Sequence, residues 1–380
     1  MTKNATTSLV SLIICLTFAA PVRGQEELVA GQSPDGAWES DNGKTCETTA
    51  LAVLALHGAG YTPIHFSGSS ESAPSLALRR GLFFLRACRH TEGELAGYFF
   101  NDCVFPVDSS ENPMLGHMIT TFAVASVFSW LGTPALKQPL EEGLKFILAR
   151  QLTGGGWPGR LDSQEPDLET SCWAVFALRE TEAGDKSANA ESARKGLAYI
   201  HSAVKSGLAQ GGGERGTTAT DASPSGKEQP TAAVLLDPAL LAFGLLALEC
   251  SGAEDAQALL DTFRPQLEAG LPSASRDNPR WWFFATALVW RCSGLEGKTS
   301  CSLGQDSEEF RKRWGSALRD AIWGVKKVES SSPLPATFDS RVNPGAMYCL
   351  VRGKAYWHAM SALALQRYYR YEPLFRGTAR

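Results

Sequence analysis

Six acidic side chains stand just before, or within the first turn of, segments that are apolar enough to form buried helices. The free amides at the start of a helix carry a partial positive charge, so a carboxylate there either caps the helix or shares the site with an anionic substrate group such as a diphosphate. Asp237-Pro238 is the clearest cap, because Asp accepts from free amides and Pro tolerates the first helical position. We expect capping first and catalysis second for Asp35, Glu47, Asp167, Glu169, Asp237 and Asp339.

Two histidines and several aromatic residues also stand at the starts of apolar helices. His117 lies in Gly116-His117-Met118, and His358 lies in Tyr356-Trp357-His358. Aromatic faces suit an apolar or cationic guest, but rings on helices also fill a protein interior. The hypothesis is a pocket lined by Trp282, Tyr356, His358 and His117; the alternative is two hydrogen-bonded histidines among packed rings.

One complete structural unit is visible between Glu141 and Glu180. Its first part has the one-sided apolar pattern of an amphipathic helix, and its last part, SCWAVFAL, is apolar on nearly every side. Between them, Gly154-Gly-Gly-Trp157-Pro158 supplies a hinge whose glycines permit unusual backbone angles. The pattern predicts an outer helix that feeds an inner one.

The same two kinds of helix alternate along the chain. An array of hairpins exposes apolar stripes until it is capped or closed, and inner helices that are apolar all round favour closure into a barrel of about six pairs. We expect outer helices at Ser75–His90, Pro139–Gln151, Glu191–Val204, Asp255–Leu267 and Ser307–Trp323. We expect inner helices at Thr48–Gly58, Gly116–Leu131, Glu169–Glu180, Pro238–Cys250, Trp281–Cys292 and Trp357–Tyr369.

The complete unit resembles the glutamine-tryptophan repeat of terpene cyclases, with matches at Gly143, Phe146, Ile147, Gln151, Gly155 and Trp157, although Glu142 replaces a basic residue. Partial copies contain Arg80-Gly81, Lys195-Gly196, and Gln32 with Trp38. The resemblance extends to the squalene cyclase and protein prenyltransferase family and covers most of Gln32 to Tyr371. It implies an all-α fold, an (α/α)5–6 toroid, in which Gln32, Trp38, Gln151 and Trp157 are structural repeat residues.

The catalytic motifs of this family are incomplete here. The Asp-x-Asp-Asp acid of the cyclases is absent, and Asp102-Cys103-Val104 matches the Asp-Cys-Thr variant only in part. The prenyltransferase zinc site needs an Asp-x-Cys pair and a histidine; His358 fits the histidine, but Asp237-Pro-Ala has no thiol, and two ligands make a poor zinc site. The Cys-Gly-Glu-Gln of thioester domains is also missing. We therefore expect no metal and no cofactor.

The first 24 residues read as a secretory signal peptide, with Lys3 near the start and an apolar run from Leu9 to Ala20. With Lys3 and Arg23 removed, 34 basic residues face 40 acidic ones, a net charge of −6 that disfavours nucleic acid as a partner. No later segment is expected to span a bilayer. We expect an exported protein, periplasmic or secreted.

Residues 25–380 are expected to form one domain, because helical repeats add length without adding separate cores. Ser206 to Pro230 is rich in Gly, Ser and Thr and is expected to be a flexible insert. Eight cysteines remain after Cys15 is lost. Cys88/Cys103 and Cys292/Cys301 are spaced for pairing across short loops, but cysteines also serve as small core residues.

The leading functional hypothesis is an exported, non-catalytic relative of these enzymes. It would bind a ligand or protein through the barrel cavity or its mouth, the ligand being an apolar or anionic-headed small molecule. The alternative is an enzyme of the same architecture, cyclase- or transferase-like or glycan-processing, that uses acidic residues outside the known motifs.

Overall fold

The computed structural model describes residues 26–40, 43–63, 71–100, 112–181, 187–211, 236–273, 278–293, 301–329 and 355–366, and within them the chain is all-α. The helices are α2 (Cys46–Gly58), α3 (Ala73–Ala87), η1 (Gly93–Leu95), α4 (Pro113–Leu131), α5 (Pro134–Ala149), α6 (Leu168–Glu180), α7 (Ala188–Gly211), α8 (Pro238–Ser251), α9 (Ala256–Ala269), α10 (Pro279–Arg291) and α11 (Ser307–Glu329). Residues 26–30 and 355–366 are also helical. Two antiparallel pairs of short strands join β1 (Glu39–Ser40) to β2 (Gly43–Lys44) and β3 (Trp157–Pro158) to β4 (Pro166–Asp167).

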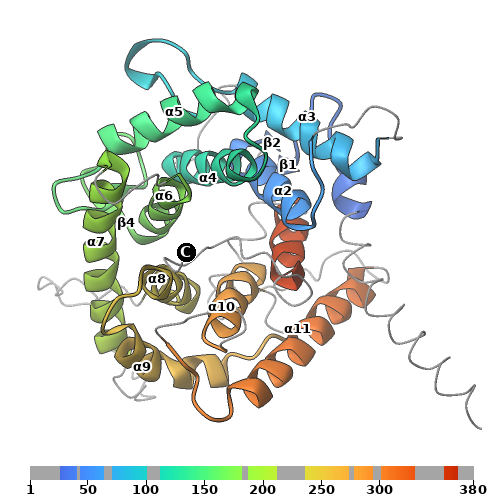
Figure 1. The fold of residues 1–380 in the computed structure, drawn as a ribbon. Helices are drawn as coiled ribbons and strands as arrows, with labels where there is room; N and C mark the ends of the chain where they lie inside the picture. Colours follow the sequence, from blue (N-terminus) through green and yellow to red (C-terminus); the bar gives the residue numbers. More distant parts are fainter. Residues whose placement is uncertain are drawn as a thin grey trace, which may run out of the picture.

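The helices lie in two concentric layers (Figure 1). Outer helices α3, α5, α7, α9 and α11 surround α2, α4, α6, α8 and α10, and the helical residues 355–366 also lie inside. Each outer helix packs on an inner helix beside it in the chain, and successive inner helices from α2 to α10 pack on one another. This is the alternation of outer and inner helices that the sequence predicts.

Burial explains why the two layers differ in composition. Every residue of α2 from Thr48 to Leu56 is buried, because this helix is covered by neighbours on all sides. In α5 the buried residues lie along one face, with Leu136, Leu140, Leu144 and Ile147 among them, while Lys137, Gln138, Glu141 and Lys145 are exposed. The outer helices therefore need one apolar stripe, and the inner helices need apolar residues all round.

The last described helical segment contacts both the first inner helix and α10. Gln366 Nε2 donates to the carbonyl oxygen of Ala55 in α2. On its other side, the ring of Trp357 meets that of Trp282 in α10 edge to face, with centroids 6.4 Å apart. Residues 355–366 thus lie between α10 and α2, which covers the apolar faces that an open array would leave exposed.

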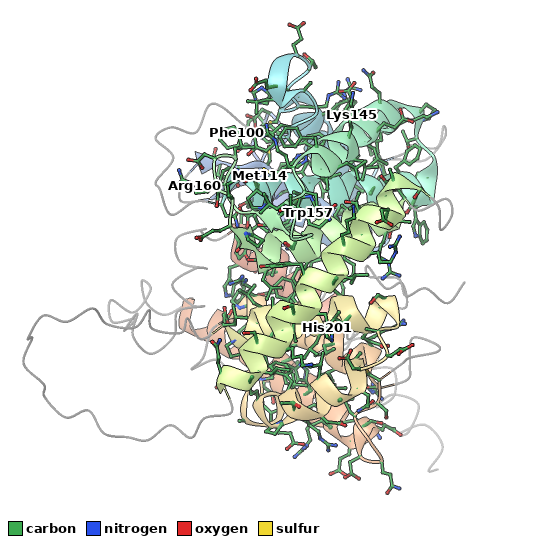
Figure 2. All side chains as sticks on the ribbon, turned by 90° about the vertical axis from the view of Figure 1, so that its left-hand side faces the viewer. Phe100, Met114, Lys145, Trp157, Arg160 and His201 are labelled. Carbon is green, nitrogen blue, oxygen red and sulfur yellow. The ribbon has the colours of Figure 1, made fainter. Side chains whose placement is uncertain are left out.

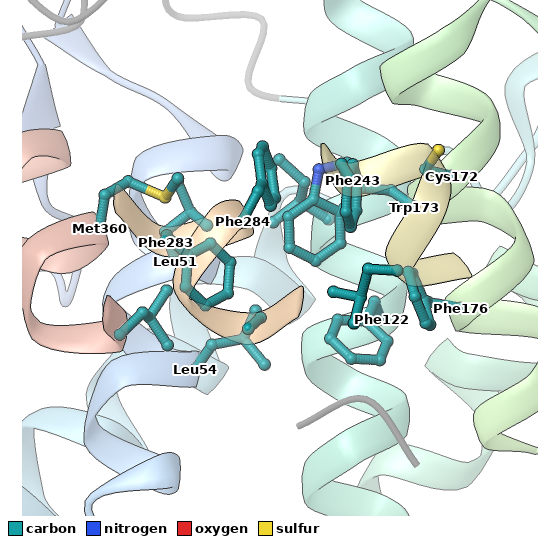
Figure 3. Packing of buried hydrophobic residues seen from close by; sticks show 14 of the residues in the cluster. Leu51, Leu54, Phe122, Cys172, Trp173, Phe176, Phe243, Phe283, Phe284 and Met360 are labelled. Atoms are coloured by element: carbon teal, nitrogen blue, oxygen red, sulfur yellow. The ribbon is translucent and has the colours of Figure 1, made fainter. Parts of the chain in front are cut away.

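Aromatic rings from four inner helices meet in the interior. Phe243 of α8 stacks on Phe284 of α10 at 4.0 Å between centroids, and Trp173 of α6 contacts both rings at 5.0 and 6.1 Å. Phe122 of α4 lies 5.5 Å from Trp173. Figure 3 shows these side chains in one cluster with Leu51, Leu54 and Met360. All of them are buried, so side chains fill the space between these helices.

The hinge between α5 and α6 is fixed by hydrogen bonds from two side chains. Gln151 Nε2 donates to the carbonyl oxygens of Gly155 (2.7 Å) and Ser192 (2.8 Å), the second of which belongs to α7. Trp157 donates from its backbone N–H to the Ser171 hydroxyl (2.9 Å) and from its indole Nε1 to the Ile147 carbonyl (2.7 Å). The hinge therefore joins its own outer helix, its own inner helix and the next outer helix.

The hinge before α2 repeats this arrangement. Gln32 Nε2 donates to Gly36 O (3.0 Å) and to Ala77 O of α3 (2.8 Å). Trp38 donates from its backbone to Thr49 Oγ1 (3.1 Å) and from its indole to Leu28 O (2.7 Å). The two hinges share the same donors and acceptors although their residues lie more than a hundred positions apart.

Glycine is required on both sides of this contact. Gly155 has φ +91°, and a Cβ there would overlap the carbonyl oxygen of Lys195 in α7; Gly36 (φ +94°) meets Arg80 O in the same way. The residue after each of these carbonyls is also glycine, because the hinge tryptophan packs on it: Gly196 faces Trp157. Figure 2 shows Trp157 beside α7. The Arg80-Gly81 and Lys195-Gly196 fragments are thus the receiving half of the hinge contact.

Two expectations from the sequence need correction. Ser206 to Gly211 belong to α7, so the insert expected from Ser206 does not begin there; Leu208 stays buried and holds this last turn against the core. Residues 212–230 lie outside the described part of the chain, as does the segment 1–24. In addition, α4 is long and apolar enough to cross a bilayer, although no such segment was expected, but 72% of its most apolar window is buried among the other helices.

Replacing Trp157 with alanine should lower the free energy of unfolding by about 3–5 kcal/mol, because the ring is fully buried and its indole N–H is hydrogen-bonded. Trp130→Ala is the matched control, since this tryptophan is 52% exposed and should change stability by less than about 1 kcal/mol. Chemical denaturation measures both. Equal losses for the two variants would contradict the hinge assignment.

Replacing Gly155 with alanine should cost about 1–3 kcal/mol, because a Cβ at this left-handed position also collides with the Lys195 carbonyl. Gly154→Ala, one residue earlier, meets no atom within 4 Å and lacks a positive φ, so it should be close to neutral. Denaturation curves of the two variants measure the loss of stability in each. A loss confined to Gly155→Ala distinguishes the hinge contact from a general effect of adding a methyl group.

Candidate functional site

His117 belongs to α4, and its buried ring packs against Phe146 of α5. Its Nδ1 accepts a hydrogen bond from the backbone N–H of Phe99 (3.1 Å), and its ring packs against Tyr98, Phe99 and Phe146. Burial lowers the pKa of His117 from 6.5 to about 3, and the carbonyl of Gly143 only partly offsets this effect. The ring is therefore neutral at physiological pH.

His117 occupies the position of a hinge hydroxyl. Thr49 and Ser171 accept from the backbone of Trp38 and Trp157, and His117 accepts in the same way from Phe99. The backbone hydrogen bonds of the turn also match. In this turn His90 N–H donates to the Tyr98 carbonyl and Gly97 N–H to the His90 carbonyl. In the hinge before α6, Leu152 N–H donates to the Gly156 carbonyl and Gly155 N–H to the Leu152 carbonyl. The hinge between α3 and α4 is thus a third, diverged copy.

The other substitutions in this third copy compensate one another. Arg89 stands in the place of Gln32 and Gln151, and its Nε lies 3.1 Å from Glu142 Oε2. Glu142 is the residue that replaces the basic position of the repeat. Gly97, at φ +90°, packs against the Glu142 carbonyl as Gly155 packs against Lys195. An ion pair has therefore taken over from the glutamine as the link to the next outer helix.

The remaining residues of the expected pocket gather around Trp357. Trp282 is fully buried and contacts the Trp357 ring, and its Nε1 has no hydrogen-bond partner among the described residues. His358 Nδ1 lies 3.2 Å from Glu27 Oε2, and Tyr356 is 2% exposed. These three lie near α10 and the ends of the described chain, whereas the ring contacts of His117 are with the hinge before α4 and with α5. Asp102 and Asp339 lie outside the described residues.

The inner helices α4, α6, α8 and α10 begin at one end of the ring, and each is capped by a polar side chain. Asn112 Oδ1 accepts from Leu115 N, Asp167 Oδ1 from Thr170 N and Asp237 Oδ1 from Ala239 N, at 3.0, 2.8 and 2.9 Å, while Asn278 Oδ1 accepts from Trp281 N at 3.0 Å. The capping roles expected for Asp167 and Asp237 are present. Asn112 Nδ2 also donates to Asp167 Oδ1 (3.2 Å), so the caps of α4 and α6 touch.

Arg280 joins the starts of three inner helices into one cluster. Arg280 lies in the first turn of α10. Its Nε donates to Glu169 Oε1 (3.2 Å), and its Nη2 donates to Glu169 Oε2. Its Nη1 donates to Asp237 Oδ2 (3.3 Å). The side chains of Arg280 and Glu169 are 6% and 7% exposed, while that of Asp237 is 25% exposed. We call Arg280, Glu169, Asp237 and Asp167 the mouth cluster.

The pKa of Glu169 is raised from 4.5 to about 7. Burial is the largest cause, and it outweighs the attraction of Arg280; the negative charges of Asp167 and Asp237 raise the pKa further. Fully ionised, the mouth cluster carries three carboxylates against one guanidinium. Glu169 can therefore take up or release a proton close to neutral pH, which is the property required of a general acid or base.

The sequence analysis named all three carboxylates of the mouth cluster but missed Arg280. A cation in the first turn of a helix is disfavoured by the helix dipole, so an arginine there signals acidic partners nearby. The sequence contains this signal in Asn278-Pro-Arg280, directly before the aromatic run. No group of three or more metal-ligating side chains that could hold an ion occurs among the described residues, and the expectation that no zinc is bound stays a prediction.

Glu169→Gln should change how stability depends on pH. Because the folded chain binds this proton more tightly than the unfolded chain, the contribution of Glu169 to the unfolding free energy falls as the pH rises from about 4.5 to about 7. Between pH 4.5 and pH 8, the unfolding free energy of the variant should therefore rise by about 2–3 kcal/mol relative to that of the wild type. Denaturation curves across this range test it, with the exposed Glu165→Gln as control; parallel pH profiles for wild type and Glu169→Gln would contradict the raised pKa.

The comparisons with known proteins give no match. No protein-family model matches the chain, and neither a curated protein nor a solved structure matches it. The resemblance to the cyclase and prenyltransferase repeats therefore rests on the residues of this chain alone.

Proposed function

We propose that this protein is an exported, non-catalytic relative of the squalene cyclase and prenyltransferase family, an α/α toroid that binds its ligand or partner at the mouth cluster. The closed circuit of inner helices and the hinges at Trp38 and Trp157 support the toroid. The apolar amino-terminal segment supports export.

The filled interior favours the mouth over the barrel centre as the binding place. The stacked pair Phe243 and Phe284, with Trp173 against it, occupies the region between α6, α8 and α10. Opening a channel for an elongated isoprenoid there would separate rings that are almost completely buried, at a cost of several kcal/mol. Within the described residues, polar groups converge instead at the amino ends of the same helices.

The charge of the mouth cluster favours a cationic or hydrogen-donating group over an anionic one. One of the free amides at the start of each helix already donates to a capping side chain, namely Asn112, Asp167, Asp237 or Asn278. Asp237 is partly exposed, and its charge together with that of Glu169 exceeds that of Arg280. The single observation that carries the proposal is that the carboxylates of the mouth cluster outnumber its one guanidinium group at capped helix ends.

Two probes with the same chain and opposite head groups test the proposal. Octylammonium and octyl phosphate, each below its micellar concentration, are titrated into the mature protein while its Tm is followed. Octylammonium should raise the Tm in a concentration-dependent manner, and Asp237→Asn, which keeps the helix cap, should abolish the rise. Asp162→Asn removes an exposed carboxylate elsewhere and should leave it intact.

A rise in Tm with octyl phosphate but not with octylammonium would contradict a cationic ligand and support the anionic-headed ligand expected from the sequence. No response to either probe, in wild type and variant alike, would remove the mouth cluster as a small-molecule site.

The second candidate is an enzyme of the same architecture. The observation that favours it is the near-neutral pKa of Glu169 beside a second carboxylate, an arrangement that suits proton donation to an alkene or a glycosidic oxygen. Turnover of an isoprenoid or an oligosaccharide that is lost in Glu169→Gln but kept in Glu165→Gln would replace the binding proposal with this one.

A further inference from the structure

Two cysteines meet at the end of α10 that lies opposite the mouth cluster. Cys292 is the residue that follows α10, and Cys301 begins the segment that leads into α11. The backbone N–H of Leu303 donates to the carbonyl oxygen of Cys292 (3.2 Å), which holds the two chain segments side by side. The cysteines are separated by eight residues in the sequence.

Both thiols are enclosed by the protein. Cys292 is 1% exposed and Cys301 is 3% exposed, and their side chains are hydrogen-bonded to each other. That hydrogen bond, together with burial, raises the pKa of the Cys292 thiol well above its usual range. No disulfide joins the two in the structure, and Cys250 at the end of α8 is buried nearby. The two side chains are therefore within hydrogen-bonding reach of each other, and Cys292 stays protonated once the chain is folded.

We propose that Cys292 and Cys301 form a structural disulfide in the exported protein. The oxidant is a disulfide-bearing thiol oxidase or low-molecular-weight disulfide. One cysteine thiolate attacks that disulfide and forms a mixed disulfide, and the second cysteine then displaces the oxidant's sulfur. The two cysteines lose two protons and two electrons, and the oxidant leaves as two thiols. Because the folded thiols are buried, the exchange takes place while the chain folds.

The disulfide would add a covalent link to the hydrogen bonds by which Ser302, just before α11, is held to Gln257 of α9. Trp314 of α11 donates from its Nε1 to Thr286 Oγ1 of α10 (2.8 Å), which fixes the middle of the helix. The covalent link would fix the segment that leads into α11. Its anchor, Cys292, follows Arg291, which forms a buried ion pair with Glu249 (3.2 Å). A short closed loop limits the unfolded chain and so raises the Tm.

Peptide mapping without reduction tests the proposal on the full-length protein secreted into an oxidising compartment. A peptide pair that joins Cys292 to Cys301 is expected, with Cys250 alkylated as a free thiol. Cys292→Ala/Cys301→Ala should lower the Tm by about 3–5 °C, and adding reductant should then cause no further loss. Cys46→Ala, a buried thiol at the start of α2, is the control that should keep its sensitivity to reductant.

Because the proposal takes its oxidant from the proposed export, a second arm separates the two. The chain is refolded with oxidised glutathione and mapped again. If the Cys292–Cys301 disulfide forms on refolding but is missing from the protein made in the cell, the exported location is wrong and the pairing stands. Free thiols at both positions in both arms, or a link from either cysteine to Cys250, would overturn the disulfide itself.

Discussion

The close approach of a hinge glycine to the carbonyl of the next outer helix is the contact on which the fold depends. At Gly155 the backbone reaches the Lys195 carbonyl with no room for a side chain, and the tryptophan two residues later covers the following glycine of α7. Each hinge thereby sets the distance and the angle between successive hairpins. The same left-handed backbone meets the Arg80 carbonyl at Gly36 and the Glu142 carbonyl at Gly97, and Gln366 donates to the Ala55 carbonyl in α2.

The three hinges also show how much of the repeat chemistry can vary. The acceptor of the hinge N–H is a threonine, a serine or His117, and the link to the next helix is a glutamine or the Arg89–Glu142 pair. A buried histidine at a helix start would ordinarily suggest a ligand or a catalytic base. Here its environment holds the pKa at about 3, so it acts as a neutral acceptor and not as a base.

Capping accounts for most of the acidic residues at the mouth, but not for Glu169. Its carboxylate is buried beside Arg280 and other carboxylates, an arrangement that costs stability when all groups are ionised. Perturbed pKa values cluster at functional sites, and this is the physical reason for proposing the mouth cluster as the binding site. The opposite end of α8 and α10 has a different character, with the paired Arg291 and Glu249 beside three buried thiols.

The sequence alone determined the alternation of helices, the hinges at Trp38 and Trp157 and the caps Asp167 and Asp237, because each depends on periodicity or on contacts within a few positions. Outer helices reveal their buried face through spacing, Gly155 and Trp157 mark the hinge, and Asp237-Pro238 marks a helix start. The tertiary structure decided which side chains meet. An inner helix that is apolar on all sides has no sequence signal for its rotation, so neither the filling of the interior by Trp173 and Phe284 nor the position of His117 followed from the pattern. Arg280 reaches its partners over 111 and 43 residues, and such pairing exists only once the ring brings the helix starts together.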